Sequence, residues 1–313
     1  MKDRYGRKIE YLRLSITPRC NLRCIYCAPE GCTDSSGALS DDDIENIGRA
    51  SAKAGIRYIK ITGGEPLMRR SCTGIIRRLK AIDGIEEVTL TTNGTLLPEY
   101  AEELASAGTD CVNVSLDTAD AEQYAAMTGF DMLDRVESGI EALCGAGIPV
   151  RLNCVLLGGI NDGAFRELLR FPETNNIDLR FIELMPIGHG KEFSFISGGS
   201  IYQEISRIHP LSPSRYRSRG PAVYFESTEL IGRIGFISAV SRDFCKSCNR
   251  IRITSDGILK PCLSLGIGID IKPYLHDETK LCEAVRDAAY QKPPMHCFCG
   301  SNAETAAMNT IGG

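Results

Sequence analysis

The sequence predicts an α/β protein, with a partial, TIM-like (β/α)6 barrel followed by a smaller α+β domain. Up to about residue 184, short β-rich runs alternate with helical patterns. Repeated β/α units of this kind form parallel sheets with right-handed crossovers. After about Met185 the alternation stops, which indicates a second unit. Glycines lie where four of the helices give way to strands, as helix ends favour, at Gly55, Gly84, Gly108 and Gly147.

The six predicted strands are short β-rich runs, and helical patterns lie between them. Ser40 followed by Asp43 predicts an N-cap and an acidic first turn for the first helix. Ligands of such a fold bind at the carboxyl ends of the strands. The predicted strands are residues 11–17, 56–62, 87–92, 111–116, 149–155 and 179–184. The predicted helices include residues 42–54, 73–82, 98–107, 133–146 and 164–173.

The C-terminal part of the sequence indicates mixed structure. A glycine-rich stretch at 188–199 and a basic stretch at 212–220 predict loops. Two pairs of short β runs predict hairpins, one of them around the turn dipeptide Asp256-Gly257. We therefore predict a barrel domain over residues 1–215 and a C-terminal domain over residues 216–313. The predicted hairpins pair 223–226 with 233–237, and 250–254 with 258–261.

The composition is that of a globular protein of one large or two linked domains, with 313 residues, 43% hydrophobic and 24% charged. Its net charge of −4 argues against general nucleic-acid binding, so an anionic ligand needs a local basic cluster. The charged residues 1–10 do not form a signal peptide, and no apolar run is long enough to span a membrane. Fourteen cysteines in this setting predict a cytoplasmic, oxygen-sensitive protein rather than a disulfide framework.

A first cysteine set follows the first predicted strand directly. Cys20, Cys24 and Cys27 have the spacing C-x3-C-x2-C, with the aromatic Tyr26 before the last cysteine. Three thiolates hold three irons of a cubane cluster and leave the fourth iron open, whereas a four-cysteine ferredoxin set only passes electrons. A zinc knuckle or buried packing thiols are the competing interpretations. Zinc favours four ligands in paired C-x2-C groups, and packing thiols need no fixed spacing.

A second cysteine set, Cys245, Cys248 and Cys262, has the spacing C-x2-C-x13-C. The spacing favours a zinc site and a second open cluster about equally. A zinc site would need a fourth ligand. The candidates for that ligand are Cys282, Cys297 and Cys299.

Two arginines flank the second cysteine set. If their segment is a strand, Arg250 and Arg252 project from one face. Two guanidinium groups beside a metal site suit a polyphosphate. A solvated basic strand is the competing interpretation.

Polar residues end three further predicted strands, as a barrel active site requires. In Thr62-Gly63-Gly64-Glu65-Pro66 the glycines let the backbone approach a ligand, and either Glu65 or backbone carbonyls are suited to an ammonium group. Thr91-Thr92-Asn93-Gly94 and Ser115-Leu116-Asp117 end the next two strands. For Asp117 the favoured role is a helix cap.

The chain ends in Gly312-Gly313, which is slim enough to enter a narrow pocket, although most chain ends fray. The four histidines have no motif spacing, and we predict structural or surface roles for them. They are His189, His209, His276 and His296.

Together these motifs resemble, almost end to end, the GTP 3′,8-cyclases of molybdenum cofactor biosynthesis. These are radical S-adenosylmethionine (SAM) enzymes with two [4Fe–4S] clusters. The first cysteine motif is common to the radical SAM superfamily, whereas the second set, the paired arginines and the diglycine end are specific to this family. Further matching stretches are residues 11–15, 62–70, 113–117, 180–185, 244–252, 256–263 and 311–313.

The resemblance implies roles for individual residues. A first cluster, which cleaves SAM reductively, is implied on Cys20, Cys24 and Cys27. A second cluster, whose open iron meets the guanine of GTP, is implied on Cys245, Cys248 and Cys262. SAM is implied to contact Tyr26, Gly64, Ser115 and Met185. GTP is implied to contact Arg13, Lys60, Thr91, Arg151, Arg180, Arg250, Ile251 and Arg252. Catalytic assistance is implied for Arg252, Gly312 and Gly313.

The implied reaction begins when a 5′-deoxyadenosyl radical removes hydrogen from ribose C3′. The carbon radical attacks guanine C8, and reduction gives (8S)-3′,8-cyclo-7,8-dihydroguanosine 5′-triphosphate, the first step of molybdenum cofactor (molybdopterin) biosynthesis. This lyase would need an external low-potential reductant and a downstream cyclic pyranopterin monophosphate synthase. We expect a monomer or homodimer that binds neither nucleic acid nor membrane.

The sequence departs from the family pattern at a few positions. Lys60 replaces a usual arginine, and Arg151 replaces a common lysine, so the bidentate fork is lost at Lys60. Ala28 replaces a usual methionine, and we predict that the nearby Cys32 is not a fourth ligand, because it would close the SAM site. The alternative enzyme is another two-cluster radical SAM protein, such as a peptide or protein maturase. The non-catalytic alternative is a zinc- or iron-binding scaffold or electron carrier.

Overall fold

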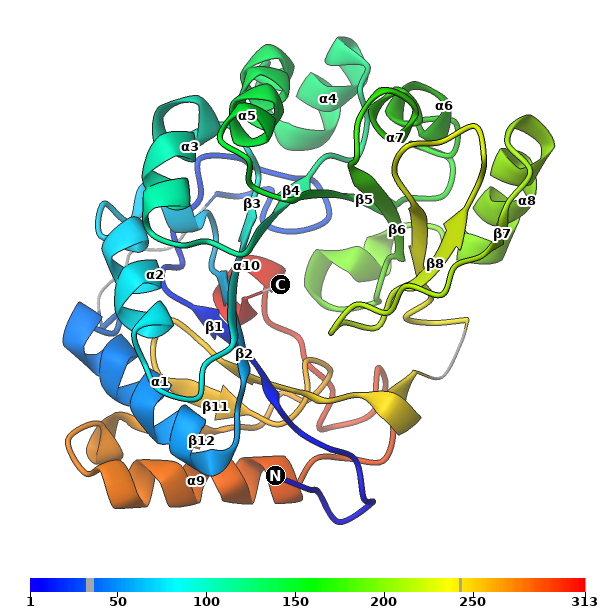
Figure 1. The fold of residues 1–313 in the computed structure, drawn as a ribbon. Coiled ribbons are helices and arrows are strands. Elements are labelled where there is room, and N and C mark those ends of the chain that lie inside the picture. The colour runs from blue at the N-terminus through cyan, green and yellow to red at the C-terminus, as the bar shows by residue number, and fades with distance from the viewer. Residues whose placement is uncertain (32–36, 242–243, 313) are drawn as a thin grey trace.

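The computed structural model describes residues 1–31, 37–241 and 244–312, and all six predicted barrel strands form there. They lie side by side in chain order and pair in parallel, so the partial barrel is confirmed (Figure 1). The barrel strands are β1 (Tyr11–Ser15), β2 (Tyr58–Thr62), β3 (Glu87–Thr92), β4 (Cys111–Ser115), β5 (Val150–Leu156) and β6 (Asp178–Glu183).

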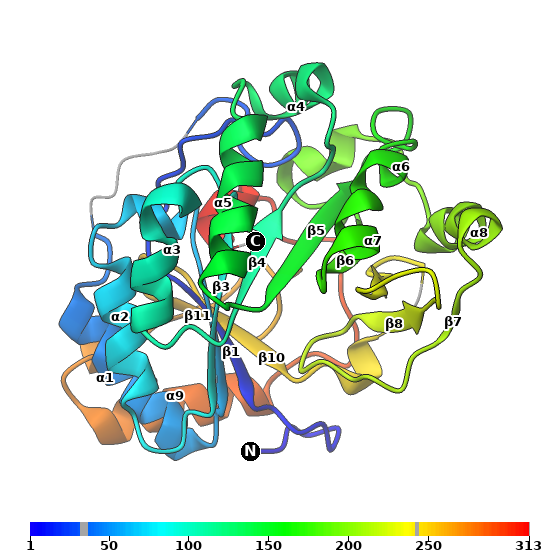
Figure 2. The same cartoon turned by 45° about the horizontal axis from the view of Figure 1, so that its top comes forward.

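Helices cover the outer face of these strands, as Figures 1 and 2 both show. The predicted first helix begins with a capping box between Ser40 and Asp43, and it ends at Gly55, whose φ of 106° suits glycine. Apolar side chains facing the sheet drive this arrangement, because parallel strands need cover on both faces. The helices of this part are α1 (Asp41–Ala54), α2 (Cys72–Lys80), α3 (Leu97–Ser106), α4 (Ala121–Thr128), α5 (Leu133–Gly145), α6 (Phe165–Leu168) and α7 (Arg170–Thr174).

Two helical features differ from the sequence prediction. The helix predicted over 164–173 is split into α6 and α7, because Pro172 has no N–H to continue the hydrogen-bond ladder across Leu169. The short helix α4 was not predicted. It buries only Tyr124, Met127 and Thr128, too few residues to give a clear periodic pattern, and Asp120 caps its start by accepting from the Gln123 N–H.

The C-terminal part extends the same sheet at both ends. Strand β10 (Arg250–Ile253) pairs in parallel with β1, and strand β9 (Ile234–Ile237) pairs in parallel with β6. Both predicted hairpins form, so the sheet runs β12-β11-β10-β1-β2-β3-β4-β5-β6-β9-β8-β7. The remaining elements are β7 (Ser212–Pro213), β8 (Val223–Glu226), β11 (Ile258–Lys260), β12 (Ile269–Asp270), α8 (Gly198–Ile208), α9 (Glu278–Tyr290) and α10 (Met308–Ile311).

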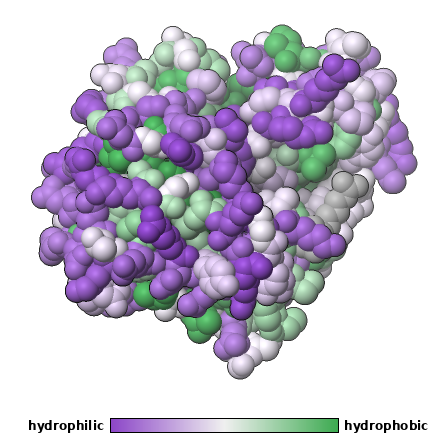
Figure 3. Space-filling model, turned by 60° about the horizontal axis from the view of Figure 1, so that its bottom comes forward, coloured by the Kyte–Doolittle hydropathy of each residue, from purple (hydrophilic) through white to green (hydrophobic). Residues whose placement is uncertain are grey.

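One large apolar core lies between the strands and the outer helices. It includes the alternate side chains Leu12 and Leu14 of β1, and Ile59 and Ile61 of β2, each fully buried. The face drawn in Figure 3 is mainly hydrophilic, with hydrophobic residues in small groups. Among the described residues, the longest helices are too short and too polar to cross a bilayer.

Candidate active site

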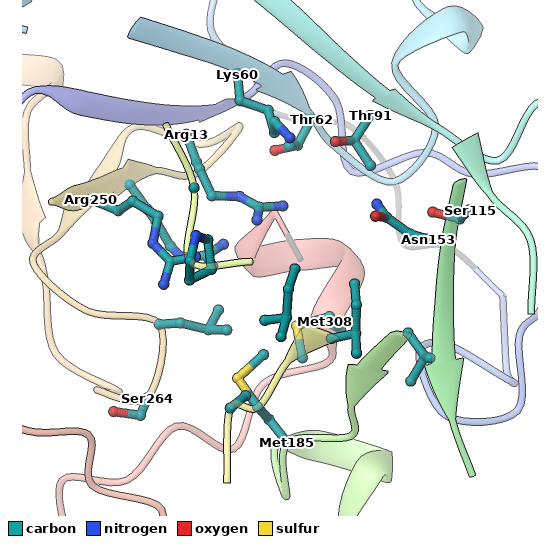
Figure 4. Close-up of a pocket in the computed structure, with 18 of the residues that line it drawn as sticks. Arg13, Lys60, Thr62, Thr91, Ser115, Asn153, Met185, Arg250, Ser264 and Met308 are labelled. Atoms are coloured by element: carbon teal, nitrogen blue, oxygen red, sulfur yellow. The ribbon is translucent and has the colours of Figure 1, made fainter. Parts of the chain in front are cut away.

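The main pocket lies inside the barrel and is lined by residues from both parts of the chain. Both predicted cysteine sets line it. Figure 4 shows Arg13, Lys60 and Arg250 on one side of this pocket and Ser115 and Asn153 on the other. The structure therefore brings together motifs that lie more than two hundred residues apart in the sequence.

The first cysteine set occupies the loop at the carboxyl end of β1. The loop turns back at Cys24, whose carbonyl accepts from the N–H of Cys27 at 2.9 Å and of Ala28 at 3.1 Å. The Cys20 sulfur lies 3.5 Å from the Leu22 N–H nitrogen and 3.7 Å from Asn93 Nδ2. Burial, together with the nearby negative charges of Asp117 and of the other two thiolates, raises the pKa of Cys24 well above its usual value. A deprotonated set therefore needs a cation such as iron to hold it together.

Asp117 anchors this loop and does not cap a helix, so the predicted capping role is wrong. Its two carboxylate oxygens accept from the Tyr26 hydroxyl at 2.7 Å and from the Val155 N–H at 2.7 Å. Burial raises the pKa of Asp117 to about 6. Asp120, three residues later, caps α4 in its place. Asp117 lies at the end of β4, as predicted, but its side chain forms a tertiary contact with Tyr26 instead of a helix cap.

The glycine loop after β2 approaches the cysteine loop closely. A Cβ on Gly64 would lie 2.3 Å from the Arg19 carbonyl oxygen, so no larger residue fits. The Glu65 carboxylate is fully buried and accepts from the Leu67 N–H, the Thr92 hydroxyl and the Asn93 N–H. Burial raises the pKa of Glu65 to about 7. Of the two options for an ammonium group, Glu65 is used to hold the loop, which leaves the backbone carbonyls.

A row of cations crosses the barrel interior below these loops. Arg13 of β1 lies in register with Arg252 of β10 on one side and with Lys60 of β2 on the other. Burial lowers the pKa of Arg13 to about 10, and burial with the nearby Arg180 lowers the pKa of Lys60 well below its usual value. Buried like charges are costly unless an anion joins them, so the row fits a polyanionic ligand.

Two further arginines of the predicted nucleotide site line the same pocket. Arg151 on β5 is held by the Tyr216 hydroxyl at 2.9 Å, and it lies 3.7 Å from the Asp178 carboxylate. Arg180 on β6 donates to the Asn113 side-chain oxygen. Both guanidinium groups are therefore fixed in direction before any ligand arrives.

The second cysteine set meets at the opposite, amino-terminal edge of the strands. Cys245 and Cys248 precede β10, while Cys262 follows β11, which runs antiparallel to β10 and so ends beside its start. Burial opposes ionisation of Cys248, but the positive charges of Arg250 and Lys292 outweigh it and lower its pKa to about 6. This set is thus surrounded by cations, in contrast to the first.

Most of the residues predicted to contact GTP or SAM line the pocket. Of the predicted GTP and SAM contacts, the side chain of Ile251 is the exception, because it packs in the core on the other face of β10. The following predicted contacts line the pocket: Arg13, Tyr26, Lys60, Gly64, Thr91, Ser115, Arg151, Arg180, Met185, Arg250 and Arg252.

The spare cysteines do not complete a zinc site. Cys282 lies on the buried face of α9, Cys297 donates to the Cys299 carbonyl at 2.7 Å, and Cys299 is exposed. In the part of the chain that the structure describes, no three Cys, His, Asp or Glu side chains converge on one point as a single ion needs. A cubane instead offers each thiolate its own iron. Cys32 lies outside the described residues.

The C-terminal tail enters the mouth of the barrel, where α10 lies in Figures 1 and 2. Arg252 donates to the Gly312 carbonyl at 2.6 Å. Gly312 has a φ of 70°, and a Cβ there would lie 3.0 Å from Ser15 Cβ and from Thr62 Oγ1. The tail up to Gly312 is therefore packed rather than frayed. Gly313 lies outside the described residues.

Several residues that line the pocket were not predicted from the sequence. Arg7, Lys292 and His296 all lie around the second cysteine set. His296 contacts the Cys245 sulfur, a contact that the structural or surface role predicted for this histidine did not specify. No motif spacing links residues 292–296 to the second cysteine set. Their position next to Cys297, a candidate ligand, was the only feature of the sequence that pointed to this site.

Comparison with known proteins bears directly on this pocket. Residues 14–171 match the Radical SAM superfamily, and residues 177–298 match Molybdenum Cofactor Synthesis C. The chain is 41% identical to the GTP 3′,8-cyclase of Geobacter sulfurreducens over 322 residues, covering 99% of both chains. It is 40% identical to that of Heliobacterium modesticaldum, covering all of both chains, and 39% identical to that of Clostridium perfringens strain SM101, covering 95% of both.

This chain belongs to the GTP 3′,8-cyclase family of the radical SAM superfamily. The GTP 3′,8-cyclase relatives align over nearly their whole length, so both cysteine sets fall within the shared region. The superfamily and family identity, rather than thiol spacing, decides between zinc and clusters. Two [4Fe–4S] clusters and SAM are the cofactors of this chain.

Solved structures show the same fold at low identity. Streptococcus suis SuiB bound to S-adenosylmethionine has a TM-score of 0.66 at 18% identity, covering 91% of this chain and 66% of SuiB. A radical SAM methyltransferase from Sphaerobacter thermophilus has a TM-score of 0.51 at 19% identity, covering 66% of both chains. Since enzymes of different activity share it, the fold alone does not select the reaction.

Proposed function

We propose that this protein is a GTP 3′,8-cyclase in which the two cysteine sets divide the work across one pocket. The observation that carries the proposal is the order of groups along the strands. The SAM-type cysteine loop lies at their carboxyl ends, the second set lies at the amino-terminal edge, and the cation row lies between them. A nucleotide triphosphate fits the charge of that row, because guanidinium forks bind phosphate strongly.

The cluster ligands are assigned from the cysteine spacing and the family resemblance, and both sets line the pocket. We assign the first cluster to Cys20, Cys24 and Cys27. The second cluster is assigned to Cys245, Cys248 and Cys262. When bound, the first cluster with SAM supplies the 5′-deoxyadenosyl radical, and the second offers an open iron to the guanine.

The chain's own residues then position SAM. Tyr26, held by Asp117, the Gly64 backbone, Ser115 and Met185 surround the space beside the first set. The carbonyls of the glycine loop would accept hydrogen bonds from the SAM ammonium group, because the Glu65 carboxylate is already engaged. With SAM bound, these residues would hold its reactive carbon in a fixed position relative to the ribose, and such positioning contributes to catalysis.

The cations orient GTP so that C3′ of the ribose faces SAM. Arg13, Lys60, Arg250 and Arg252 bind the triphosphate, and Arg151 and Arg180 line the same pocket near Lys60. Arg252 also holds Gly312, so the tail closes the mouth of the barrel and excludes water while the C3′ radical attacks C8.

Several finer points complete the proposal. A low-potential reductant supplies electrons, a cyclic pyranopterin monophosphate synthase takes the product, and the enzyme works in the cytoplasm as a monomer or homodimer. We place the boundary between the barrel domain and the C-terminal domain between residues 215 and 216. Strands of the C-terminal domain nevertheless join the sheet of the barrel domain.

The test is anaerobic incubation with SAM, GTP and a strong reductant, with iron and sulfide counted beforehand. We expect about eight irons per chain for two cubanes, 5′-deoxyadenosine, and a cyclised dihydro-GTP product. Formation of 5′-deoxyadenosine with GTP unchanged would refute the assignment of GTP as the substrate. About four irons with zinc present would refute the second cluster.

A further inference from the structure

We propose that His296 is a positioning residue for the second cluster. Its ring and backbone nitrogens hydrogen-bond the Cys245 thiolate, fix its direction and raise the reduction potential of the cluster. This inference rests on the proposed function, in which Cys245 is a ligand of that cluster.

The geometry places two nitrogens of one residue on one sulfur. His296 Nδ1 lies 3.4 Å from Cys245 Sγ, and the His296 N–H donates to the same sulfur at 3.2 Å. Cys245 is buried and His296 half-buried, and both line the pocket. An iron-bound thiolate has no proton and can only accept a hydrogen bond. Nδ1 must therefore carry the ring proton in the loaded protein.

A buried arginine fixes the segment that carries His296. The Arg7 guanidinium donates to the Cys245 carbonyl at 2.8 Å and to the Pro293 carbonyl at 2.6 Å. Asp3 holds the same guanidinium through its carboxylate. Because one rigid planar group contacts both chain segments, the distance between Cys245 and the approach to His296 is set by Arg7.

Both ends of segment 292–297 are hydrogen-bonded to residues next to Cys262. Lys292 is 2% exposed and donates to the carbonyl of Pro261, the residue before Cys262, at 2.8 Å. The Cys297 N–H donates to Ser264 Oγ at 3.0 Å, and this hydroxyl lies 3.3 Å from the Cys262 sulfur. The segment therefore spans the second cysteine set and contacts it at both ends.

In the first set, two different residues donate to the Cys20 sulfur. Cys20 receives the Leu22 N–H at 3.5 Å and Asn93 Nδ2 at 3.7 Å, both longer than the His296 contacts. Hydrogen bonds to ligand sulfur stabilise the reduced cluster by withdrawing charge, and so raise its reduction potential. His296 thus gives the substrate-side cluster a higher potential than its thiolates alone would.

The experiment measures the second cluster in isolation. In the full-length chain, Cys20, Cys24 and Cys27 are replaced by alanine, iron and sulfide are restored anaerobically, and the potential is titrated by electron paramagnetic resonance. Into this background we add His296→Phe, which removes the ring donor and keeps the ring. His296→Asn keeps a donor near the Nδ1 position, and His276→Phe changes an exposed histidine that is not part of the pocket lining.

We expect His296→Phe to shift the potential to a more negative value and to alter the cluster spectrum. His296→Asn should recover most of the shift, and His276→Phe should match the background. An unchanged potential in His296→Phe with full iron content would overturn the role of His296. Loss of iron in both His296 variants would also overturn it, since the thiolates and the backbone donor remain. A background that binds no cluster would refute the ligand assignment itself.

Discussion

The two cysteine sets face one pocket, but the chain builds them in different ways. The first lies within eight residues of one loop, at the carboxyl ends of the strands and next to the acid Asp117. The second joins Cys245, Cys248 and Cys262 from separate segments at the amino-terminal edge, among cations. An acidic, local site suits a positively charged sulfonium cofactor, whereas a cationic, assembled site suits a triphosphate. Changes on one side should therefore affect one ligand and spare the other.

The largest effect on stability should follow from Glu304→Ala, in the C-terminal segment that precedes α10. Glu304 and Lys260 form a buried ion pair, and Glu304 also accepts from the Thr305 and Ala306 N–H groups. Removing the carboxylate leaves Lys260 buried without its partner, which costs about 3–5 kcal/mol in the free energy of unfolding. Anaerobic urea titration measures this loss, with the exposed Glu283→Ala as the control.

The same pair predicts acid sensitivity. Burial alone would raise the pKa of Glu304, but the hydrogen bonds from Lys260 and the backbone lower it below its usual value. A lowered carboxyl pKa adds stability above the usual pKa, and that stability is lost as pH falls through the folded value. Glu304→Ala should therefore flatten the acid limb of the stability profile. An acid limb as steep as in the parent protein would contradict this role.

Arg252→Ala should uncouple the two sides. It removes the charged hydrogen bond to the Gly312 carbonyl, worth about 1.5–3 kcal/mol, so cyclised product per SAM cleaved should fall about 10- to 100-fold. Cleavage of SAM without GTP should change little. Arg252→Lys keeps the charge, and its yield of cyclised product per SAM cleaved should lie between those of the parent protein and Arg252→Ala. Equal loss of SAM cleavage would show that the halves are not separable.

Gly312→Ala tests the tail by shape alone. The positive φ and the close approach to Ser15 and Thr62 should cost about 1–3 kcal/mol and lower cyclisation about tenfold or more. Gly159→Ala is the matched control, because Gly159 has a φ of 79° but nothing within 4 Å of a Cβ. Product formation measured by chromatography should fall in the first variant only. A similar fall in both would reduce the effect to backbone strain.

Asp117→Asn should give the smallest effect, confined to the first side. One of the two hydrogen bonds at the carboxylate is lost, worth about 1 kcal/mol, so the KM for SAM should rise about fivefold. GTP affinity should stay unchanged. Asp120→Asn is the control, since asparagine caps a helix as well as aspartate does. A changed GTP affinity in Asp117→Asn would contradict the separation of the two sides.

The same comparison explains what the sequence could predict. The barrel strands, the first cysteine loop and the hairpin around Asp256-Gly257 are local patterns, and all three formed as predicted. The use of Asp117, the engagement of Glu65 and the placing of His296 depend on contacts between distant segments. No periodicity or spacing in the sequence encodes such contacts, so the capping role predicted for Asp117 was wrong and the contact of His296 with Cys245 was not predicted.

The most direct test removes each cysteine set in turn from the full-length chain and measures 5′-deoxyadenosine and GTP binding. Alanine at Cys245, Cys248 and Cys262 should leave reductive SAM cleavage in place but weaken GTP binding and abolish cyclisation. Alanine at Cys20, Cys24 and Cys27 should abolish 5′-deoxyadenosine while GTP still binds. If removing the second set abolishes 5′-deoxyadenosine, or removing the first abolishes GTP binding, the division of work between the two sets is wrong.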